Sequence, residues 1–175
     1  MESFPKHIKD FKTELKGKTV LVTGASRGIG KAIAIAFARE SCNLVIVGRN
    51  KDRLEKAAED IRSLSVNVYL QLIDVSDEKS VLSGLGEISK NAAPIDILVN
   101  NAGIYKTSSV LGHTSELWNQ IISTNLNSAF IFSRELIHLQ LYSHSKVFPI
   151  LILNWIFNYK FPKLLFSKYN KEQKL

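Results

Sequence analysis

Three glycines between Thr23 and Gly30 are spaced as in a loop that binds phosphate. The stretch reads Thr-Gly-Ala-Ser-Arg-Gly-Ile-Gly. The largely apolar run 18–22 before it resembles a buried parallel strand, and the apolar residues after it (Ile29, Ala32, Ile33, Ala36, Phe37) recur at helical spacing. Glycines permit a tight turn and a close approach by pyrophosphate, while a helix N-terminus offers unpaired N–H groups. The pattern predicts a strand, a turn and a helix that hold a pyrophosphate.

Polar residues follow the later expected strands. Asp74 and Val75 come after the strand expected at 67–73, and the run Asn100-Asn101-Ala102-Gly103 ends the strand expected at 95–100. Each has an ordinary explanation, because Asp74 can cap the next helix and paired asparagines suit a tight turn. Asn125 has the helical phase of Trp118, Ile121, Ile122 and Ala129, a face expected to pack inward. A buried amide there needs hydrogen-bond partners.

Taken together, these residues closely resemble the short-chain dehydrogenase/reductase family over about residues 15–139. The glycine spacing is Thr-Gly-x-x-x-Gly-x-Gly, which differs from the general G-x-G-x-x-G pattern. The resemblance implies hydride transfer between a nicotinamide dinucleotide and a carbonyl or alcohol carbon. It also implies roles for two residues: Asp74 would bond the adenine ring, and Asn125 would anchor a water chain to a catalytic lysine. The implied cofactor-binding residues are Gly24, Ser26, Arg27, Gly28, Ile29, Gly30, Arg49, Asp74, Val75, Asn101, Ala102 and Gly103.

The order of elements predicts an α/β fold, a Rossmann-type doubly wound parallel sheet. Four strands are expected (18–22, 43–47, 67–73, 95–100), alternating with helices at 28–41, 51–64, 76–91 and from Thr114 to about Leu139. A fifth, edge strand is a further interpretation of 147–153, where Pro149 would cost one ladder hydrogen bond. We divide the chain into a leader helix (1–16), a nucleotide-binding domain (17–139) and a divergent tail (140–175).

The residues that end the second strand favour NADP(H) over NAD(H). An acid about 20 residues past the glycines binds the 2′-OH of NAD, whereas a basic residue accommodates the 2′-phosphate of NADP. Here that strand ends in Gly48-Arg49, and Arg27 in the glycine loop adds a second cation. Either arginine alone is more often a solvated surface residue. Together, two guanidiniums facing one pocket favour a phosphate.

The catalytic half of the family pattern is not found. In the family a tyrosine is the acid/base, a lysine lowers its pKa and a serine holds the carbonyl oxygen. Tyr142 and Lys146 have the Tyr-x-x-x-Lys spacing, but Tyr142 follows Gly103 by only 39 residues, which leaves no room for a fifth strand between them. We interpret this spacing as coincidental, so Asn125 is the one member of the tetrad that we assign.

Composition bounds the remaining choices. The net charge of +7 is concentrated in the tail, where six lysines and one acid follow Leu139, so nucleic-acid binding is not expected. A single cysteine, Cys42, excludes an internal disulfide and fits a reducing compartment, and the start lacks a signal peptide, so we expect a cytoplasmic protein. Four scattered histidines suggest no metal site. The apolar run near 147–157 is short of the roughly 20 residues of a membrane span, so membrane contact is not expected.

Three functional hypotheses remain. The first is an NADP(H)-dependent oxidoreductase of the family that is catalytically incomplete, with negligible turnover. The second is a non-catalytic nucleotide-binding or dimerisation partner of a full-length relative, forming a homo- or hetero-oligomer through the Asn125 helix, as that helix often does in the family. The third is a truncated product that does not fold stably. The tail is rich in Phe, Tyr, Asn, Lys and Ile, and we interpret it as a translated intron or alternative exon.

Overall fold

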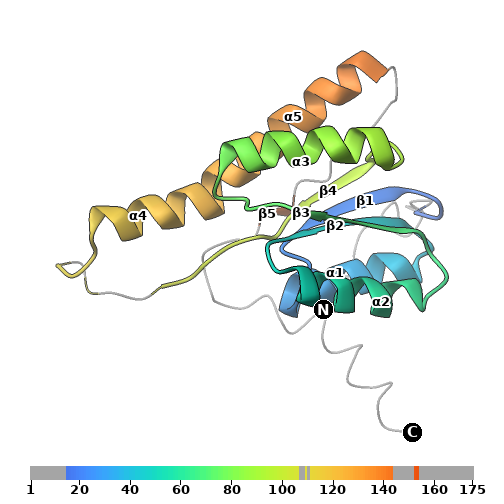
Figure 1. Cartoon of the computed structure of the whole chain (residues 1–175), viewed down its shortest axis with the longest axis horizontal. Coiled ribbons are helices and arrows are strands. Elements are labelled where there is room, and N and C mark those ends of the chain that lie inside the picture. The colour runs from blue at the N-terminus through green and yellow to red at the C-terminus, as the bar shows by residue number, and fades with distance from the viewer. Residues whose placement is uncertain (1–14, 107–108, 110, 144–151, 154–175) are drawn as a thin grey trace, which may run out of the picture.

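The sheet is parallel and doubly wound, as predicted. The computed structural model describes residues 15–106, 109, 111–143, 152 and 153. Its strands lie in the order β3-β2-β1-β4-β5, and every neighbouring pair is parallel. After β3, at one edge, the chain crosses to the other side of β1, where β4 pairs with it (Figure 1). The strands are β1 (Thr19–Thr23), β2 (Asn43–Gly48), β3 (Val68–Leu72), β4 (Ile97–Asn100) and β5 (Ile152–Leu153).

Helices cover both faces of this sheet. One layer consists of α1 (Gly28–Arg39) and α2 (Lys51–Arg62), and the other of α3 (Glu78–Asn91) and α5 (Ser128–Ser143) (Figure 1). The predicted inner face of α2 is confirmed, since Leu54, Ala57, Ala58 and Ile61 are all buried. Because both faces are covered, β1 is buried at every residue and β2 at all but its first. This two-sided burial explains their continuous apolar sequences.

The face of α1 that meets the sheet differs from the apolar periodicity of its sequence. The buried residues are Gly30, Ala34 and Ala38, whereas Ile29 is 61% exposed. Small side chains let the helix lie close to the strands, and the larger Ile33 and Phe37 pack at its flanks. A similar close approach explains Gly84 in α3, because a β-carbon there would overlap the side chain of Ile73.

The single long helix expected from Thr114 to Leu139 is interrupted. Thr114 caps α4 (Ser115–Ile122), as predicted, by accepting a hydrogen bond from the N–H of Leu117 at 3.2 Å. A π-helical turn, η2 (Ser123–Asn127), then leads into α5. The expectation that Trp118 packs inward is wrong: it is 59% exposed, because α4 extends beyond the sheet and buries none of its residues (Figure 1).

The expected edge strand is present where the structure describes it. Ile152 pairs with Val99 and Leu153 with Asn100. The remainder of that prediction (147–151), the rest of the tail (154–175) and most of the leader helix (1–14) lie outside the described residues. Among the described residues, no helix is long and apolar enough to cross a membrane. Nor does that part of the chain contain a His, Cys, Asp and Glu cluster suited to a metal ion.

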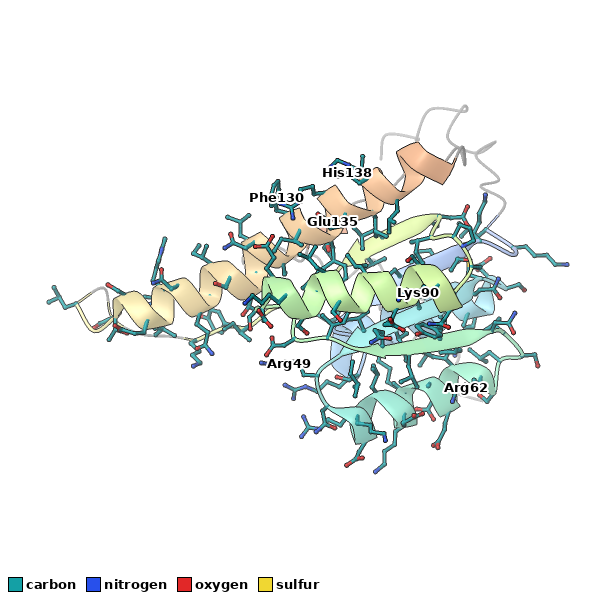
Figure 2. All side chains as sticks on the ribbon, turned by 45° about the horizontal axis from the view of Figure 1, so that its top comes forward. Arg49, Arg62, Lys90, Phe130, Glu135 and His138 are labelled. Carbon is teal, nitrogen blue, oxygen red and sulfur yellow. The ribbon has the colours of Figure 1, made fainter. Side chains whose placement is uncertain are left out.

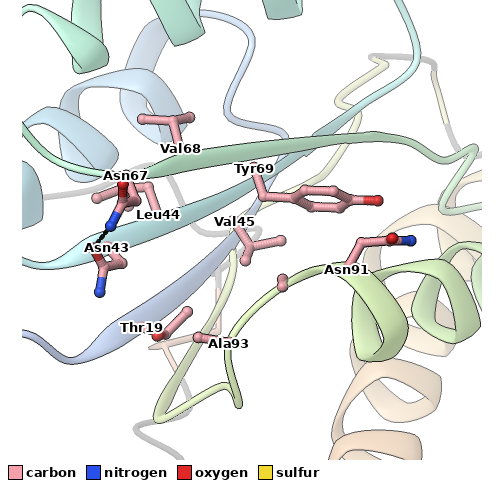
Figure 3. A pocket seen from close by; sticks show the side chains of 10 residues that line it. Thr19, Asn43, Leu44, Val45, Asn67, Val68, Tyr69, Asn91 and Ala93 are labelled. Carbon is pink, nitrogen blue, oxygen red and sulfur yellow. Dashed lines mark hydrogen bonds between the residues drawn. The ribbon is translucent and has the colours of Figure 1, made fainter.

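A pocket of about 350 Å³ lies at the amino ends of the strands. Its lining includes Thr19, Asn43 and Val68 from the starts of β1, β2 and β3, and Asn91 from the last turn of α3 (Figure 3). Ligands of doubly wound sheets bind outside the opposite, carboxyl edge. The pocket is therefore separate from the glycine loop, which follows the carboxyl end of β1.

Candidate functional site

The glycine loop is held against the residues that follow β4. Gly24 has φ +68°, and a β-carbon there would lie 2.9 Å from the Cα of Ala102. A β-carbon on Gly30 would overlap the side-chain amide of Asn101 and the carbonyl oxygen of Gly24. Gly28 differs, because its φ is +56° but a β-carbon there would meet no atom of the described residues within 4 Å. Gly24 and Gly30 thus permit close packing within the chain, whereas Gly28 leaves one side of the turn open.

Thr23 and Asn101 join the two segments. The Thr23 hydroxyl accepts hydrogen bonds from the backbone N–H groups of Asn101 (3.0 Å) and Ala102 (2.9 Å), and donates to the carbonyl of Val99 (3.3 Å). The Asn101 side chain in turn donates to the carbonyl oxygens of Thr23 (2.9 Å) and Gly24 (3.3 Å). The loop after β1 and the loop after β4 therefore form one hydrogen-bonded unit.

The ends of β2 and β3 bring opposite charges to the same edge. A guanidinium nitrogen of Arg49 lies 3.7 Å from a carboxylate oxygen of Asp74. Figure 2 shows Arg49 at the opposite end of the sheet from Lys90 and Arg62. Partial burial acts to raise the pKa of Asp74, but hydrogen bonds from the Ser76 hydroxyl and N–H and the charge of Arg49 outweigh it, so this pKa lies below its ordinary value. Asp74 is therefore ionised at neutral pH.

Arg27 is the N-cap residue of α1, in the loop that follows the carboxyl end of β1. It is exposed, and it forms no ion pair with any acid in the part of the chain that the structure describes. Among the other predicted residues, Ser26 packs beside Gly48 and Val75 is buried under the sheet. Gly103 is exposed. The cofactor residues predicted from sequence thus gather along one edge.

Asn125 lies in the π-helical turn and contacts the loop after β4. Its side-chain oxygen accepts a hydrogen bond from the N–H of Ile104 at 2.8 Å, and its amide nitrogen donates to the carbonyl of Ile104 at 2.9 Å. The sequence predicts that an amide at this position needs hydrogen-bond partners, and the partners of the half-buried Asn125 are these backbone groups. Asn125 fixes the position of the loop that follows the Asn-Asn-Ala-Gly run.

Tyr142 is far from this edge. The start of α5 is attached to the carboxyl end of β4, because Asn100 donates to the carbonyl of Ala129 (3.4 Å) and to the hydroxyl of Ser133 (3.3 Å). Tyr142 follows Ala129 by thirteen residues, or about 20 Å along a helix that rises 1.5 Å per residue. Lys146 lies outside the described residues.

Sequence reasoning missed the importance of Thr23 and Ser133. In the sequence Thr23 is only the first residue of the glycine stretch, and Ser133 belongs to no motif. A hydroxyl residue at the last position of a buried strand is a usable signal, because a polar group there needs partners. No local pattern marks Ser133 as the partner of Asn100, since the two residues are 33 positions apart.

A parallel doubly wound sheet with a glycine loop at its carboxyl edge defines a Rossmann-type nucleotide-binding fold. A family model described as short chain dehydrogenase matches residues 18–146. The chain therefore belongs to the short-chain dehydrogenase/reductase family, whose members are oxidoreductases. The match continues past Leu139, where we expected the resemblance to end, and includes Tyr142 and Lys146.

Individual relatives agree with this assignment. The chain is 37% identical over 116 residues to gluconate 5-dehydrogenase of Gluconobacter oxydans, covering 66% of this chain and 45% of that protein. It is 40% identical over 120 residues to the NADP-dependent (R)-specific alcohol dehydrogenase of Lentilactobacillus kefiri, covering 69% and 47%. The crystal structure of L-sorbose reductase from Gluconobacter frateurii complexed with NADPH and L-sorbose matches with a TM-score of 0.68 and 32% identity, covering 71% and 48%. The chain thus spans about half the length of these relatives.

Proposed function

We propose that this chain binds NADP(H) along the carboxyl edge of its sheet. The observation that carries the proposal is the unit formed by Gly24, Gly30 and Asn101, which holds the glycine loop against the residues that follow β4 at the carboxyl edge of the sheet. The backbone around Gly28 and the first turn of α1 would hold the pyrophosphate. Arg27 and Arg49 would bind the 2′-phosphate, and a relative that carries NADP dependence in its name supports this preference.

The other residues of the edge would hold the rest of the cofactor. Asp74 and Val75 end the β3 segment beside Arg49, where the adenine would lie, and the exposed Ile29 would be covered by the bound dinucleotide. The run from Asn101 to Gly103 would form the wall near the nicotinamide. When bound, NADP(H) supplies or accepts the hydride of a carbonyl/alcohol interconversion.

We further propose that the chain alone transfers hydride at a negligible rate. Asn125 stands at the cofactor edge, but its amide contacts Ile104 and can neither donate nor accept a proton from a substrate at neutral pH. Tyr142 would be about 20 Å from the carboxyl end of β4, too far for proton transfer, which requires hydrogen-bond distance. The activity of longer family members would therefore require groups that this edge lacks in the described residues.

Thermal unfolding with cofactor tests the binding proposal. At one hundred times its dissociation constant, a ligand that binds only the folded state stabilises it by about 2.7 kcal/mol. For a chain of this size that corresponds to a rise in Tm of roughly 5–10 °C. We expect NADPH to raise Tm more than NADH does, and R27Q/R49Q to remove the difference. R62Q is the matched control, because Arg62 pairs with Glu55 at the other end of the sheet. Equal shifts by the two cofactors would contradict the preference.

A second candidate function, a partner that associates with another subunit, is favoured by the outer surface of η2 and α5. Leu126 of η2 and Phe130 and Ile137 of α5 recur at helical spacing and are 57%, 61% and 45% exposed. The Arg134 guanidinium lies over the Phe130 ring, 5.4 Å from its centre. We propose that this stripe contacts a second copy or a longer relative in the cytoplasm. Light scattering should report a dimer that F130E disrupts and L82E, an equally radical change on exposed Leu82 of α3, does not. A monomeric wild-type chain that also fails to co-purify with a full-length relative would contradict it.

A further inference from the structure

Asp74 occupies a place from which it can control Arg49. The two residues follow neighbouring parallel strands, and their backbones are joined because the N–H of Ile73 donates to the carbonyl of Gly48 at 3.1 Å. One carboxylate oxygen of Asp74 faces Arg49 at 3.7 Å. The other accepts from the Ser76 N–H at 3.0 Å and from the Ser76 hydroxyl at 2.6 Å. The carboxylate is therefore anchored on one side and pairs with the arginine on the other.

The backbone of Asp74 is anchored as well. Its N–H donates to the hydroxyl of Ser80 at 3.0 Å, in the first turn of α3. Arg49, by contrast, makes one ion pair with the acids of the described residues, at the long distance of 3.7 Å, and its side chain is 61% exposed. An exposed ion pair of this kind is weak. If a ligand approaches this edge, the arginine can move, whereas the carboxylate stays in place.

We propose that Asp74 is a specificity-determining residue that limits the preference of this site for NADP(H) over NAD(H). The inference rests on the proposed binding of NADP(H) through Arg49. A 2′-phosphate, which carries a charge of nearly −2 at neutral pH, must take the Arg49 guanidinium away from the fixed carboxylate. It must also bind beside a negative charge that does not move. NADH, which has a 2′-hydroxyl, meets neither cost.

The ratio of the two affinities isolates this effect. NADPH and NADH share the adenine, the pyrophosphate and the nicotinamide. Any contact of Asp74 with the adenine therefore affects both cofactors equally and cancels in the ratio. Only the interaction with the 2′ group remains. The lowered pKa of Asp74 agrees with the geometry, because it means that the carboxylate keeps its charge when the cofactor binds.

The experiment measures dissociation constants of NADPH and NADH for the full chain by isothermal titration calorimetry. D74N removes the charge and keeps an oxygen for Ser76. We expect D74N to increase the ratio of NADH to NADPH dissociation constants roughly threefold to tenfold, a range set by the weakness of exposed charge interactions. S76A is the matched control, because it removes the 2.6 Å hydrogen bond but leaves the charge. It should change the ratio less than twofold.

The R49Q variant shows whether the effect of Asp74 on the ratio passes through Arg49. In an R49Q chain, where there is no guanidinium to release, D74N should increase the ratio less than it does in the wild-type chain. If D74N does not fold, D74S provides the same neutral site with a hydroxyl acceptor. A wild-type chain that prefers NADPH, with a ratio that D74N or D74S leaves unchanged or lowers, would overturn the inference and leave the proposed function intact. A wild-type chain without that preference, in which D74N also leaves the ratio unchanged, would overturn both.

Discussion

Replacing Thr23 with valine removes a hydroxyl while leaving the size of the side chain almost unchanged. In the folded chain that hydroxyl is the acceptor for the N–H groups of Asn101 and Ala102. Thr23 is 2% exposed, so water cannot replace the hydroxyl without local opening. Each unsatisfied buried N–H costs roughly 1–3 kcal/mol, so T23V should lower the free energy of unfolding by about 2–6 kcal/mol.

Urea unfolding followed by far-UV circular dichroism measures this loss. With a slope of roughly 2 kcal/mol per molar urea, the midpoint should fall by about 1–3 M. T19V is a matched control, because Thr19 is on the same strand and 4% exposed, yet its hydroxyl makes no hydrogen bond to the described residues. We expect T19V to change the midpoint by less than about 0.5 M. If T23V and T19V unfold at the same urea concentration, the joining role of the Thr23 hydroxyl is refuted.

Three further predictions concern the same edge. G30A should destabilise the chain and weaken NADPH binding in calorimetry, because its β-carbon would overlap Asn101 and Gly24, whereas G86A, with open space around it, should stabilise α3 by roughly 0.5–1 kcal/mol. N125A should increase the hydrogen-exchange rate of the Ile104 amide at least tenfold, since that amide loses its acceptor, while N127A on the exposed side of the same turn should not. Burial acts to raise the pKa of Asp74, but Ser76 and Arg49 lower it by more, so the folded chain has the lower pKa and the ionised carboxylate stabilises the fold at a pH above the ordinary pKa. This stabilisation is lost as the pH falls through the lowered pKa. D74N should therefore flatten the acid limb of a curve of unfolding free energy against pH.

Much of the fold was accessible from the sequence because its signals are local. The runs that became β1 and β2 are apolar throughout, as two-sided burial requires, and the inner face of α2 follows a 3.6-residue period. One interpretation failed where tertiary packing overrides the local pattern, because at Trp118 the expected inward face has no strand beneath it. On α1, for which the sequence predicted a helix but no inner face, the small residues Gly30, Ala34 and Ala38 face the sheet.

The site was predictable in its composition and only partly in its contacts. Glycine spacing and the residues at strand ends indicated which segments share the carboxyl edge. Asn125 pairs with the backbone of Ile104, which is 21 positions away in the sequence, and Thr23 pairs with Asn101, which is 78 positions away. Periodicity and propensity contain no information about such distances. The π-helical turn that contains Asn125 interrupts a continuous helical pattern without a Gly or Pro that would mark the interruption.

The hydrogen bonds between Thr23 and Asn101 also determine when the candidate site at the carboxyl edge can form during synthesis. The β1–β2–β3 layer and its two helices are complete once residue 72 has left the ribosome. The glycine loop, however, obtains its hydrogen-bond donors from residues 101 and 102, so the loop must wait for roughly thirty more residues, or about 2–6 s at usual rates of synthesis. Until then, the first βαβ unit exposes the edge of β1 on which β4 will pair. A nascent chain paused before residue 101 would thus have most of a Rossmann layer but not the hydrogen bonds that hold the candidate site together.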